Sequence, residues 1–268
     1  MNPNSLFSME HVSAGYSQKT ILTDVSFSLE RGTVTGLLGA NGCGKTTLIK
    51  TICNLVPHTG ECFLDDTPLS NLSARKLSRF ISYIPQKSGI TISLSVLEVV
   101  LMGFNPVLKP LEYPDSRQKA AAYSSLELFG IAHSAQTLYE KCSEGEKQLC
   151  ILARTFVQNT RLLLLDEPDS ALDFHNRYHM MNALVELTHG RDKSVLLCLH
   201  DPQLALDYCD QLILLQDGRC SSILHPHVDS LDTMETALSH IYGPLNLMQV
   251  QNKSGNMRII LLSDLKCT

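Results

Sequence analysis

Apolar and polar residues alternate with two different periods along this chain, which divides it into predicted strands and helices. Between residues 6 and 30 the alternation is short, which predicts two short strands joined by a turn at residues 17–20. The apolar run 32–40 has glycine near both ends and predicts a buried strand. Residues 44–56 predict a helix that ends before Pro57. The chain therefore opens with strands rather than with a helical bundle.

After residue 60, predicted strands and helices alternate. The expected segments are a strand and turn at 60–70, a short helix and strand within 73–85, helical segments from about 88 to 150, a helix at 146–160, a strand at 161–168, a helix at 176–190, a strand at 193–201, a helix at 202–210 and a strand at 211–218. A helix near 234–242 and a β-hairpin at 245–263 end the pattern. This alternation predicts an α/β fold with a largely parallel sheet and an inserted helical subdomain.

Composition and charge narrow the class of protein. The 268 residues suit one large domain or a core with a smaller insert, and 44% hydrophobic and 18% charged residues are ordinary for a globular protein. A net charge of -5 without any lysine or arginine run argues against nucleic acid and against an anionic membrane surface as partners.

The sequence shows no segment suited to a membrane and no paired cysteines. The first residues lack the basic start and apolar core of a signal peptide, and no apolar run approaches the roughly 20 residues that span a bilayer. We therefore expect any membrane role to go through a partner protein. The nine cysteines form no C-x-x-C pair and lie in apolar segments, so we expect small buried side chains in a reducing cytosol.

The stretch GANGCGKT, Gly39 to Thr46, matches the phosphate-loop pattern G-x-x-x-x-G-K-[ST] between a predicted strand and a predicted helix. Backbone N–H groups must wrap a phosphate closely, which favours glycine at crowded or positive-φ positions. The following helix directs its positive end at the phosphates. Lys45 can reach the β- and γ-phosphates, and the Thr46 hydroxyl can hold Mg²⁺.

Three polar residues emerge from the ends of the later predicted strands. Asp166 and Glu167 follow four buried leucines, and ligands bind at such strand ends in sheets of this kind. Asp166 can bind Mg²⁺, while Glu167 faces a different way and can polarise an attacking water. His200 follows another buried strand, which we expect beside the phosphate-loop strand, so that the imidazole contacts the γ-phosphate.

The phosphate loop, CSEGEKQ (142–148), LLLLDEP, SALD (170–173) and LHD occur in an order and spacing that resemble the ATP-binding cassette (ABC) ATPases. The likeness runs from about residue 6 to 225. It implies a P-loop NTPase (RecA-like) core with a mixed sheet, an N-terminal antiparallel β subdomain and an inserted α-helical subdomain. The implied boundaries are 1–225 for the ATPase domain, with 88–153 inserted in it, and 226–268 for a C-terminal helix and β-hairpin appendage.

The resemblance also implies roles for single residues. Tyr16 would stack on adenine, Gln86 would reach Mg²⁺ and water, and Asp173 would lie in a loop that crosses between two cassettes. The implied catalytic residues are Glu167, His200 and Gln86, and the implied metal-binding residues are Thr46, Gln86 and Asp166. The implied nucleotide-binding residues are Tyr16, Gly39, Asn41, Gly42, Cys43, Gly44, Lys45, Thr46, Thr47, Ser143, Gly145, Glu146 and Asp173.

The charged stretch 142–146 occupies the place of the family's signature motif, leucine-serine-glycine-glycine-glutamine. Taken alone it is also compatible with a solvated surface turn. The resemblance implies that two copies dock head to tail, so that Ser143 and the Gly145 backbone meet the γ-phosphate of ATP bound by the partner. Glu144 replaces the first glycine and Glu146 the glutamine; because a carboxylate repels a triphosphate, we expect Glu144 to point away.

The segments 101–111, 126–148 and 198–219 resemble the importer cassettes for iron–siderophore, haem and cobalamin. This implies ATP and Mg²⁺ as cofactors and a position at the cytoplasmic face of the cell membrane. The implied partners are a second copy of the chain, integral membrane permease subunits and, indirectly, an extracytoplasmic substrate-binding protein. A permease helix is expected beside the Gln86 loop and residues 88–105. The alternatives are a soluble ABC ATPase acting on nucleic acid or ribosomes, the cassette of an exporter or vitamin-uptake system, and a regulatory subunit that hardly hydrolyses ATP.

Overall fold

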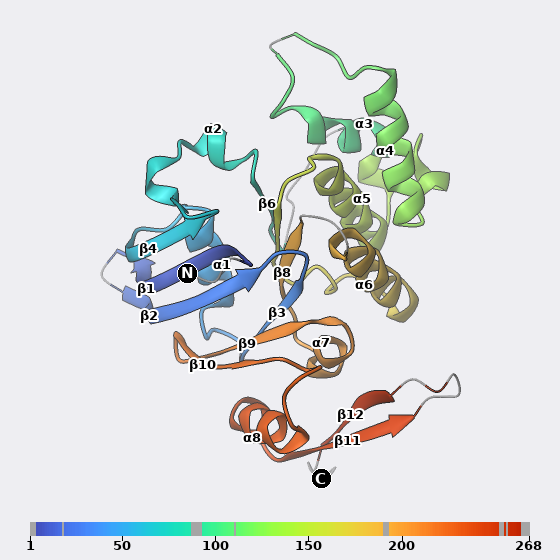
Figure 1. Cartoon of the computed structure of the whole chain (residues 1–268). Helices are drawn as coiled ribbons and strands as arrows, with labels where there is room; N and C mark the ends of the chain where they lie inside the picture. The colour runs from blue at the N-terminus through green and yellow to red at the C-terminus, as the bar shows by residue number, and fades with distance from the viewer. Residues whose placement is uncertain are drawn as a thin grey trace.

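A computed structural model of the chain describes residues 4–17, 19–86, 93–109, 111–189, 193–251, 255 and 257–263. Three groups of elements are visible in Figure 1: an N-terminal sheet, a central sheet with its helices, and a C-terminal helix and hairpin. Among the described residues, no helix has the length and apolar character needed to cross a membrane.

The N-terminal sheet is antiparallel, as predicted. Its strand order is β2-β1-β4-β5, with β1 (Ser5–Tyr16), β2 (Lys19–Glu30), β4 (His58–Leu64) and β5 (Thr67–Pro68). The two strands predicted between residues 6 and 30 are confirmed, but the turn between them is shorter than the predicted 17–20, because Tyr16 already pairs with Lys19. Register shifts along β1 keep both twelve-residue strands paired, and local alternation does not reveal such irregularities.

The central sheet has the order β10-β9-β3-β8-β7-β6 and is mixed, as predicted. Five strands run parallel and β10 is antiparallel to β9. The strands are β3 (Val34–Leu38), β6 (Ile81–Ile84), β7 (Leu162–Leu165), β8 (Ser194–Cys198), β9 (Gln211–Gln216) and β10 (Arg219–Leu224). Strand β8, which precedes His200, lies beside the phosphate-loop strand β3, as the sequence predicted.

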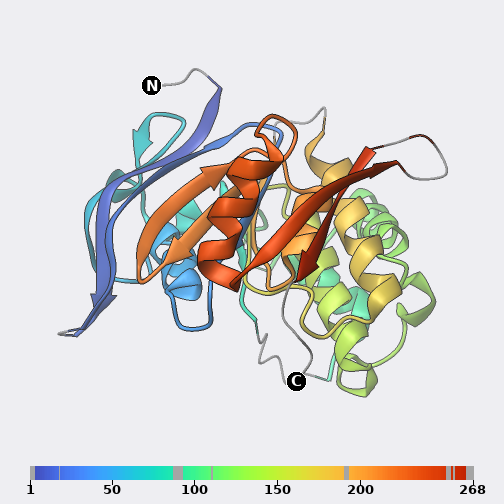
Figure 2. The same cartoon turned by 90° about the horizontal axis from the view of Figure 1, so that it is seen from below.

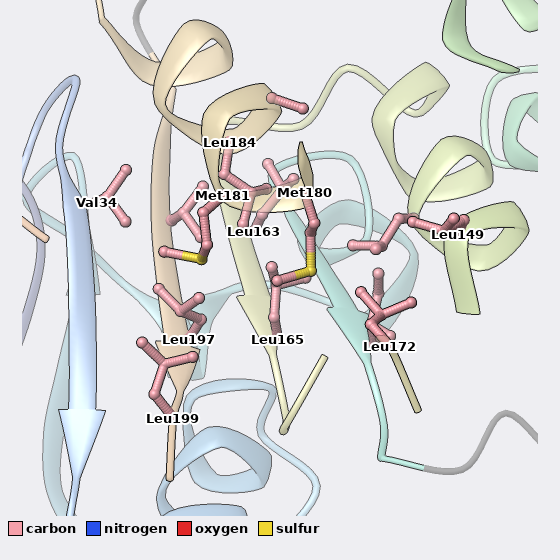
Figure 3. Close-up of a cluster of buried hydrophobic side chains, with 14 of the residues drawn as sticks. Val34, Leu149, Leu163, Leu165, Leu172, Met180, Met181, Leu184, Leu197 and Leu199 are labelled. Atoms are coloured by element: carbon pink, nitrogen blue, oxygen red, sulfur yellow. The ribbon is translucent and has the colours of Figure 1, made fainter. Parts of the chain in front are cut away.

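Two apolar layers hold the central sheet. One layer joins alternate residues of β3, β7 and β8 to α1 (Lys45–Ile52) and to the N-terminal sheet. The other joins the opposite face to α6 (Phe174–Thr188) and α7 (Pro202–Tyr208). Figure 3 shows Met180, Met181 and Leu184 of α6 over Leu163 and Leu197 of the strands. The near-continuous leucine runs of β7 and β8 follow from burial on both faces.

The helical part lies on one side of the central sheet (Figure 1). It contains α3 (Val96–Leu101), α4 (Ser116–Leu128) and α5 (Glu144–Val157), while the short α2 (Ala74–Leu77) precedes β6. The predicted insert 88–153 begins with residues 88–92, which lie outside the described residues, and α5 continues beyond 153 to Val157. The division into domains stays a prediction.

The C-terminal segment consists of α8 (Leu231–Tyr242) and a hairpin of β11 (Leu245–Gln251) and β12 (Met257–Ser263), as predicted. The Gln203 side chain on α7 donates to the Ile259 carbonyl and accepts from the Leu261 N–H, each at 2.8 Å. Figure 2 shows α8 and the hairpin lying across the central sheet. Leu245 and Leu247 join the main core, so the segment is packed rather than detached.

Candidate functional site

The phosphate loop lies between β3 and α1 and is shaped by three glycines with positive φ, Gly39 (159°), Gly42 (80°) and Gly44 (112°). A Cβ on Gly39 would lie 2.3 Å from the Leu215 carbonyl oxygen, and one on Gly44 would lie 2.8 Å from Leu22 Cδ2. These close approaches give a steric reason for glycine at positions 39 and 44. Gly44 is the residue preceding α1, so the loop leads directly into the positive end of that helix.

Lys45 folds back over this loop. Its side chain is only 5% exposed, and Nζ donates to the carbonyl oxygens of Gly39 at 2.7 Å and Ala40 at 3.3 Å. Thr47 is also buried, whereas Asn41 and Gly42 are exposed. The ammonium group is therefore already centred above the loop, in a position from which it can turn toward a phosphate.

Thr46 and Asp166 meet across the end of the central sheet. Thr46 Oγ1 donates to Asp166 Oδ1 at 3.2 Å, and Asp166 is 1% exposed at the end of β7. Burial raises the pKa of Asp166, while hydrogen bonds from Thr46 and the Cys198 thiol lower it. A hydroxyl and a buried carboxylate side by side are oxygen ligands suited to Mg²⁺.

Glu167 is held from two sides. Gln86 Nε2 donates to Glu167 Oε2 at 2.5 Å, and His200 Nε2 lies 2.6 Å from Glu167 Oε1. Glu167 also has a φ of 53°, a left-handed conformation that is uncommon outside glycine and asparagine. The structure thus brings together the three residues predicted to serve catalysis, and it turns Glu167 toward Gln86 and His200, away from the Thr46 contact of Asp166.

Tyr16 and Cys43 differ in exposure. Tyr16 ends β1 and is 45% exposed, so its ring has a free surface on which a base could stack. Cys43 is buried, and burial raises the pKa of its thiol. A cavity of about 350 Å³ borders Asn41 and Cys43 together with the β9–β10 turn and His240 of α8, but Lys45 and Thr46 do not line it. This cavity is therefore bordered by the first half of the phosphate loop and not by the Lys45 side chain.

The charged stretch 142–146 leads into helix α5, which begins at Glu144 with Ser143 as its N-cap, so the alternative of a plain solvated turn does not describe it. Ser143 caps the helix by accepting from the Glu146 N–H, and Glu146 Oε2 accepts from the Ser143 N–H at 3.0 Å. The Ser134 hydroxyl donates to Glu146 Oε1 at 2.8 Å. This reciprocal capping fixes Glu146, and the Ser143 backbone bond is the main cause that lowers the pKa of its carboxyl.

The described contacts at the start of α5 are with neighbouring segments of the chain and not with the phosphate loop. A Cβ on Gly145 would lie 3.2 Å from the Ala171 carbonyl oxygen, so Gly145 faces the loop that precedes α6. Asp173, at the end of that loop, caps α6 by accepting from the Asn176 N–H at 2.8 Å. None of the hydrogen bonds described for Ser143, Glu146 or Asp173 reaches the phosphate loop.

Sequence reasoning missed the partner of Glu144. The Glu144 side chain is 80% exposed, and its Oε1 lies 2.8 Å from Lys147 Nζ. The spacing of three residues within a predicted helix is a signal that could have revealed this pair. Glu144 therefore carries a nearby positive charge at the start of α5.

The eight described cysteines are free thiols, and the described residues contain no cluster of histidine, cysteine or acidic side chains suited to a metal ion. Six of the eight are buried, while Cys53 and Cys220 are half-buried, in agreement with the expectation that they act as small apolar side chains.

Three comparisons with known proteins bear on the site. A family model described as "ABC transporter" matches residues 22–170. The chain is 39% identical to "Hemin import ATP-binding protein HmuV" of Bordetella bronchiseptica, covering 77% of this chain and 81% of that protein. It is 36% identical to the "Probable iron chelatin transport ATP-binding protein" of Helicobacter pylori, covering 79% and 84%.

A solved structure shares the fold. It is described as "An inward-facing conformation of a putative metal-chelate type ABC transporter", with a TM-score of 0.80 and 24% identity, covering 97% of this chain and 99% of that one. Because the coverage is nearly complete, the shared fold includes α8 and the final hairpin as well as the phosphate loop.

Proposed function

This chain belongs to the ABC transporter family as an ATP-hydrolysing subunit, and we propose that it powers the uptake of a metal chelate of the iron–siderophore, haem or cobalamin type through a partner permease. The observation that carries the proposal is the identity of 39% and 36% with hemin and iron chelatin transport ATP-binding proteins, over more than three quarters of this chain. The proposal places the chain at the cytoplasmic face of the cell membrane.

The residues around the phosphate loop suit Mg²⁺ and a triphosphate. In this proposal the loop N–H groups from Gly39 to Thr47 and the Lys45 ammonium group bind the phosphates, and Tyr16 stacks on adenine. Thr46, Asp166 and Gln86 would hold the metal, since the Thr46 hydroxyl and the buried Asp166 carboxylate already lie 3.2 Å apart. When bound, Mg²⁺ supplies positive charge against the phosphate oxygens.

Hydrolysis is assigned to Glu167. Its carboxylate would accept a proton from the water that attacks the γ-phosphorus, while ADP leaves. Gln86 and His200 each contact one carboxylate oxygen, so they hold Glu167 in one orientation. His200, which extends from the end of β8 beside the phosphate-loop strand, would also contact the γ-phosphate.

A second copy of the chain is proposed to complete each ATP site. The start of α5 offers the Ser143 hydroxyl, the Gly145 backbone and a positive helix end, yet its described bonds do not reach the phosphate loop of its own chain. In a head-to-tail dimer these groups, with Glu146, would face the triphosphate of the partner. The loop that ends at Asp173 lies against Gly145 and would cross the same interface.

A groove beside the helical part is the proposed permease site. A cavity of about 290 Å³ is lined by Arg79, before β6, by Phe104, Pro106 and Val107, after α3, and by Val157 at the end of α5. Val107 is exposed, so the groove offers apolar contacts to a short helix. Closing of the dimer would move the segments that line this groove, and a permease helix bound in the groove would follow that motion. The extracytoplasmic substrate-binding protein would act only through that permease.

The test is to co-express this chain with its candidate permease, purify the complex and reconstitute it into proteoliposomes. These proteoliposomes also contain a haem- or siderophore-loaded binding protein. We expect ATP-dependent uptake of the chelate, no uptake with Glu167→Gln, and loss of the complex with Val107→Asp while ATP binding persists. An exposed control, Val228→Asp, should leave assembly unchanged. Co-purification with ribosomes or nucleic acid instead of the permease, or export of the chelate, would contradict the proposal.

A further inference from the structure

Two neighbouring loops carry the proposed catalytic pair, and they come from adjacent parallel strands. Glu167 follows β7 and His200 follows β8, and these strands pair from Leu162 with Ser194 to Leu165 with Leu197. The relative position of the two loops therefore sets whether Glu167 and His200 meet.

A single arginine bridges the two loops. Arg177, in the first turns of α6, places Nε 3.6 Å from Asp169 Oδ2 and a terminal nitrogen 3.8 Å from Asp201 Oδ2. Asp169 belongs to the loop that follows Glu167, and Asp201 is the residue after His200. Arg177 therefore contacts both loops through charge, without itself joining the contact between Glu167 and His200.

Each end of the bridge is fixed by other bonds. Asp201 caps α7, since its Oδ1 accepts from the Gln203 N–H at 2.9 Å. The loop after Glu167 is closed by the Ser170 N–H, which donates to the Glu167 carbonyl at 3.3 Å. Leu172 of the same loop packs beside Leu149 and Met180 in the apolar core (Figure 3). Both loops are thus short and held at other points, so a change at Arg177 would act mainly on how the two loops lie relative to each other.

Burial makes the bridge energetically important. Asp169 is 4% exposed; burial raises the pKa of its carboxyl, while Arg177 and His200 lower it. Asp169 is the buried end of the bridge, whereas the side chains of Arg177 and Asp201 are 32% and 41% exposed. Removing Arg177 would leave the buried Asp169 carboxylate uncompensated, which is costly. In the described part of the chain, neither Arg177 Nε nor Asp169 Oδ1 has a hydrogen-bond partner, so the contact is ionic and longer than a hydrogen bond. A small movement of the Asp169 loop would shorten this contact to a hydrogen bond.

Glu167 needs such support, because its φ of 53° is a strained backbone conformation. We propose that Arg177 is a positioning residue for hydrolysis, which holds the Asp169 loop against Asp201 so that Glu167 and His200 keep the geometry of the reaction. This inference rests on the proposed roles of Glu167 and His200. Arg177 touches neither the phosphate loop nor Glu167 in the described contacts, so it should affect turnover and not ATP binding.

The test uses the full chain and measures kcat, KM for ATP and the dissociation constant for Mg²⁺–ATPγS. Arg177→Gln should lower kcat about 10- to 100-fold, with KM and the dissociation constant within about two-fold. Arg177→Lys should recover part of the loss, because the charge is kept. The double variant Asp169→Asn with Arg177→Gln should lose no more than Arg177→Gln alone. Arg117→Gln, at an exposed arginine of α4, is the matched control and should match the wild type.

Asp201→Asn gives a second route if Arg177→Gln folds poorly. The amide oxygen keeps the α7 cap, but the charge toward Arg177 is lost, so kcat should again fall without a change in ATP binding. Unchanged kcat in both variants, or equal losses of kcat and ATP binding that follow a loss of thermal stability, would overturn the inference alone. If the wild-type chain does not hydrolyse ATP, the proposed function and this inference both fail.

Discussion

Nε2 of His200 lies 2.6 Å from Oε1 of Glu167, although the two residues follow different strands of the central sheet. Gln86 contacts the other carboxylate oxygen, so both oxygens of Glu167 are engaged. In the proposed reaction, a carboxylate fixed in this way is oriented to accept a proton before any water arrives. Several measurable consequences depend on this arrangement and on the charges near the start of α5.

Replacing Glu167 by glutamine should lower ATP hydrolysis by about 100-fold or more, because the amide cannot accept a proton from water. Binding of ATP should persist, since the phosphate loop is unchanged. The variant should accumulate as an ATP-bound dimer, which size-exclusion chromatography with Mg²⁺–ATP detects. Glu127→Gln, at an exposed residue of α4, is the control. Hydrolysis near the wild-type rate in Glu167→Gln would assign the base elsewhere.

Replacing Lys147 by alanine should weaken ATP-driven dimerisation by about five-fold, because in the proposed head-to-tail dimer Glu144 would then carry an unbalanced charge near the triphosphate of the partner. The double variant Glu144→Gln with Lys147→Ala should restore most of the loss. The ATP concentration for half-maximal dimer formation, measured in the Glu167→Gln background, reports the effect.

Salt provides the check on this explanation. Because the Glu144 side chain is exposed and that of Lys147 is half-buried, salt can screen the pair, and the difference between Lys147→Ala and the parent should shrink at about 0.5 M salt. A loss that is independent of salt, or that the double variant does not reverse, would mean that Lys147 acts by packing.

The capping carboxylate of Glu146 predicts a pH dependence of stability. Its pKa is lowered in the folded chain, so the stabilisation is present above the ordinary glutamate pKa, about 4.3, and is lost as the pH falls through the lowered value. The unfolding free energy of the wild type should therefore exceed that of Glu146→Gln at about pH 7, and the difference should be smaller at about pH 3. Denaturant titration of both proteins at the two pH values measures it. A constant difference would refute the charged cap.

Replacing Gln203 by alanine should loosen the C-terminal hairpin, because the Ile259 carbonyl and the Leu261 N–H each lose a hydrogen bond worth about 1 kcal/mol. Hydrogen exchange at the Leu261 amide should accelerate about ten-fold, while exchange in β7 stays unchanged. Gln249→Ala, at an exposed residue of β11, is the matched control. Equal exchange in both variants would show that the apolar contacts of Leu245 and Leu247 alone hold the hairpin.

The start of α5 shows which features can be predicted from local sequence alone. The sequence Ser143-x-x-Glu146 is a capping box, and the same pattern recurs at Ser95 and Glu98, where α3 begins with reciprocal bonds. Both starts could have been read from the sequence. The charge of the stretch left a solvated turn open as an alternative, because composition alone does not distinguish a solvated turn from a capped helix end.

The register of β1 and β2 could not be predicted in the same way. Register shifts between Met9 and Val12 and between Val12 and Ala14 interrupt the alternation, although pairing continues to Tyr16 and Lys19. Such irregularities depend on the neighbouring strand β4, which also pairs with β1. The apolar periodicity of β1 does not indicate that β4 will pair with it.

The sequence by itself determined the alternation of strands and helices, the phosphate loop from Gly39 to Thr46, and the acids at the end of β7. These depend on local spacing, glycine and capping, which each segment carries in its own residues. The tertiary structure alone decided that Lys45 rests on the loop carbonyls, that Glu167 meets Gln86 and His200, and that Arg177 spans Asp169 and Asp201. Those contacts join segments far apart in the chain, and their distances follow from the order and register of β3, β8 and β7, which no local period encodes.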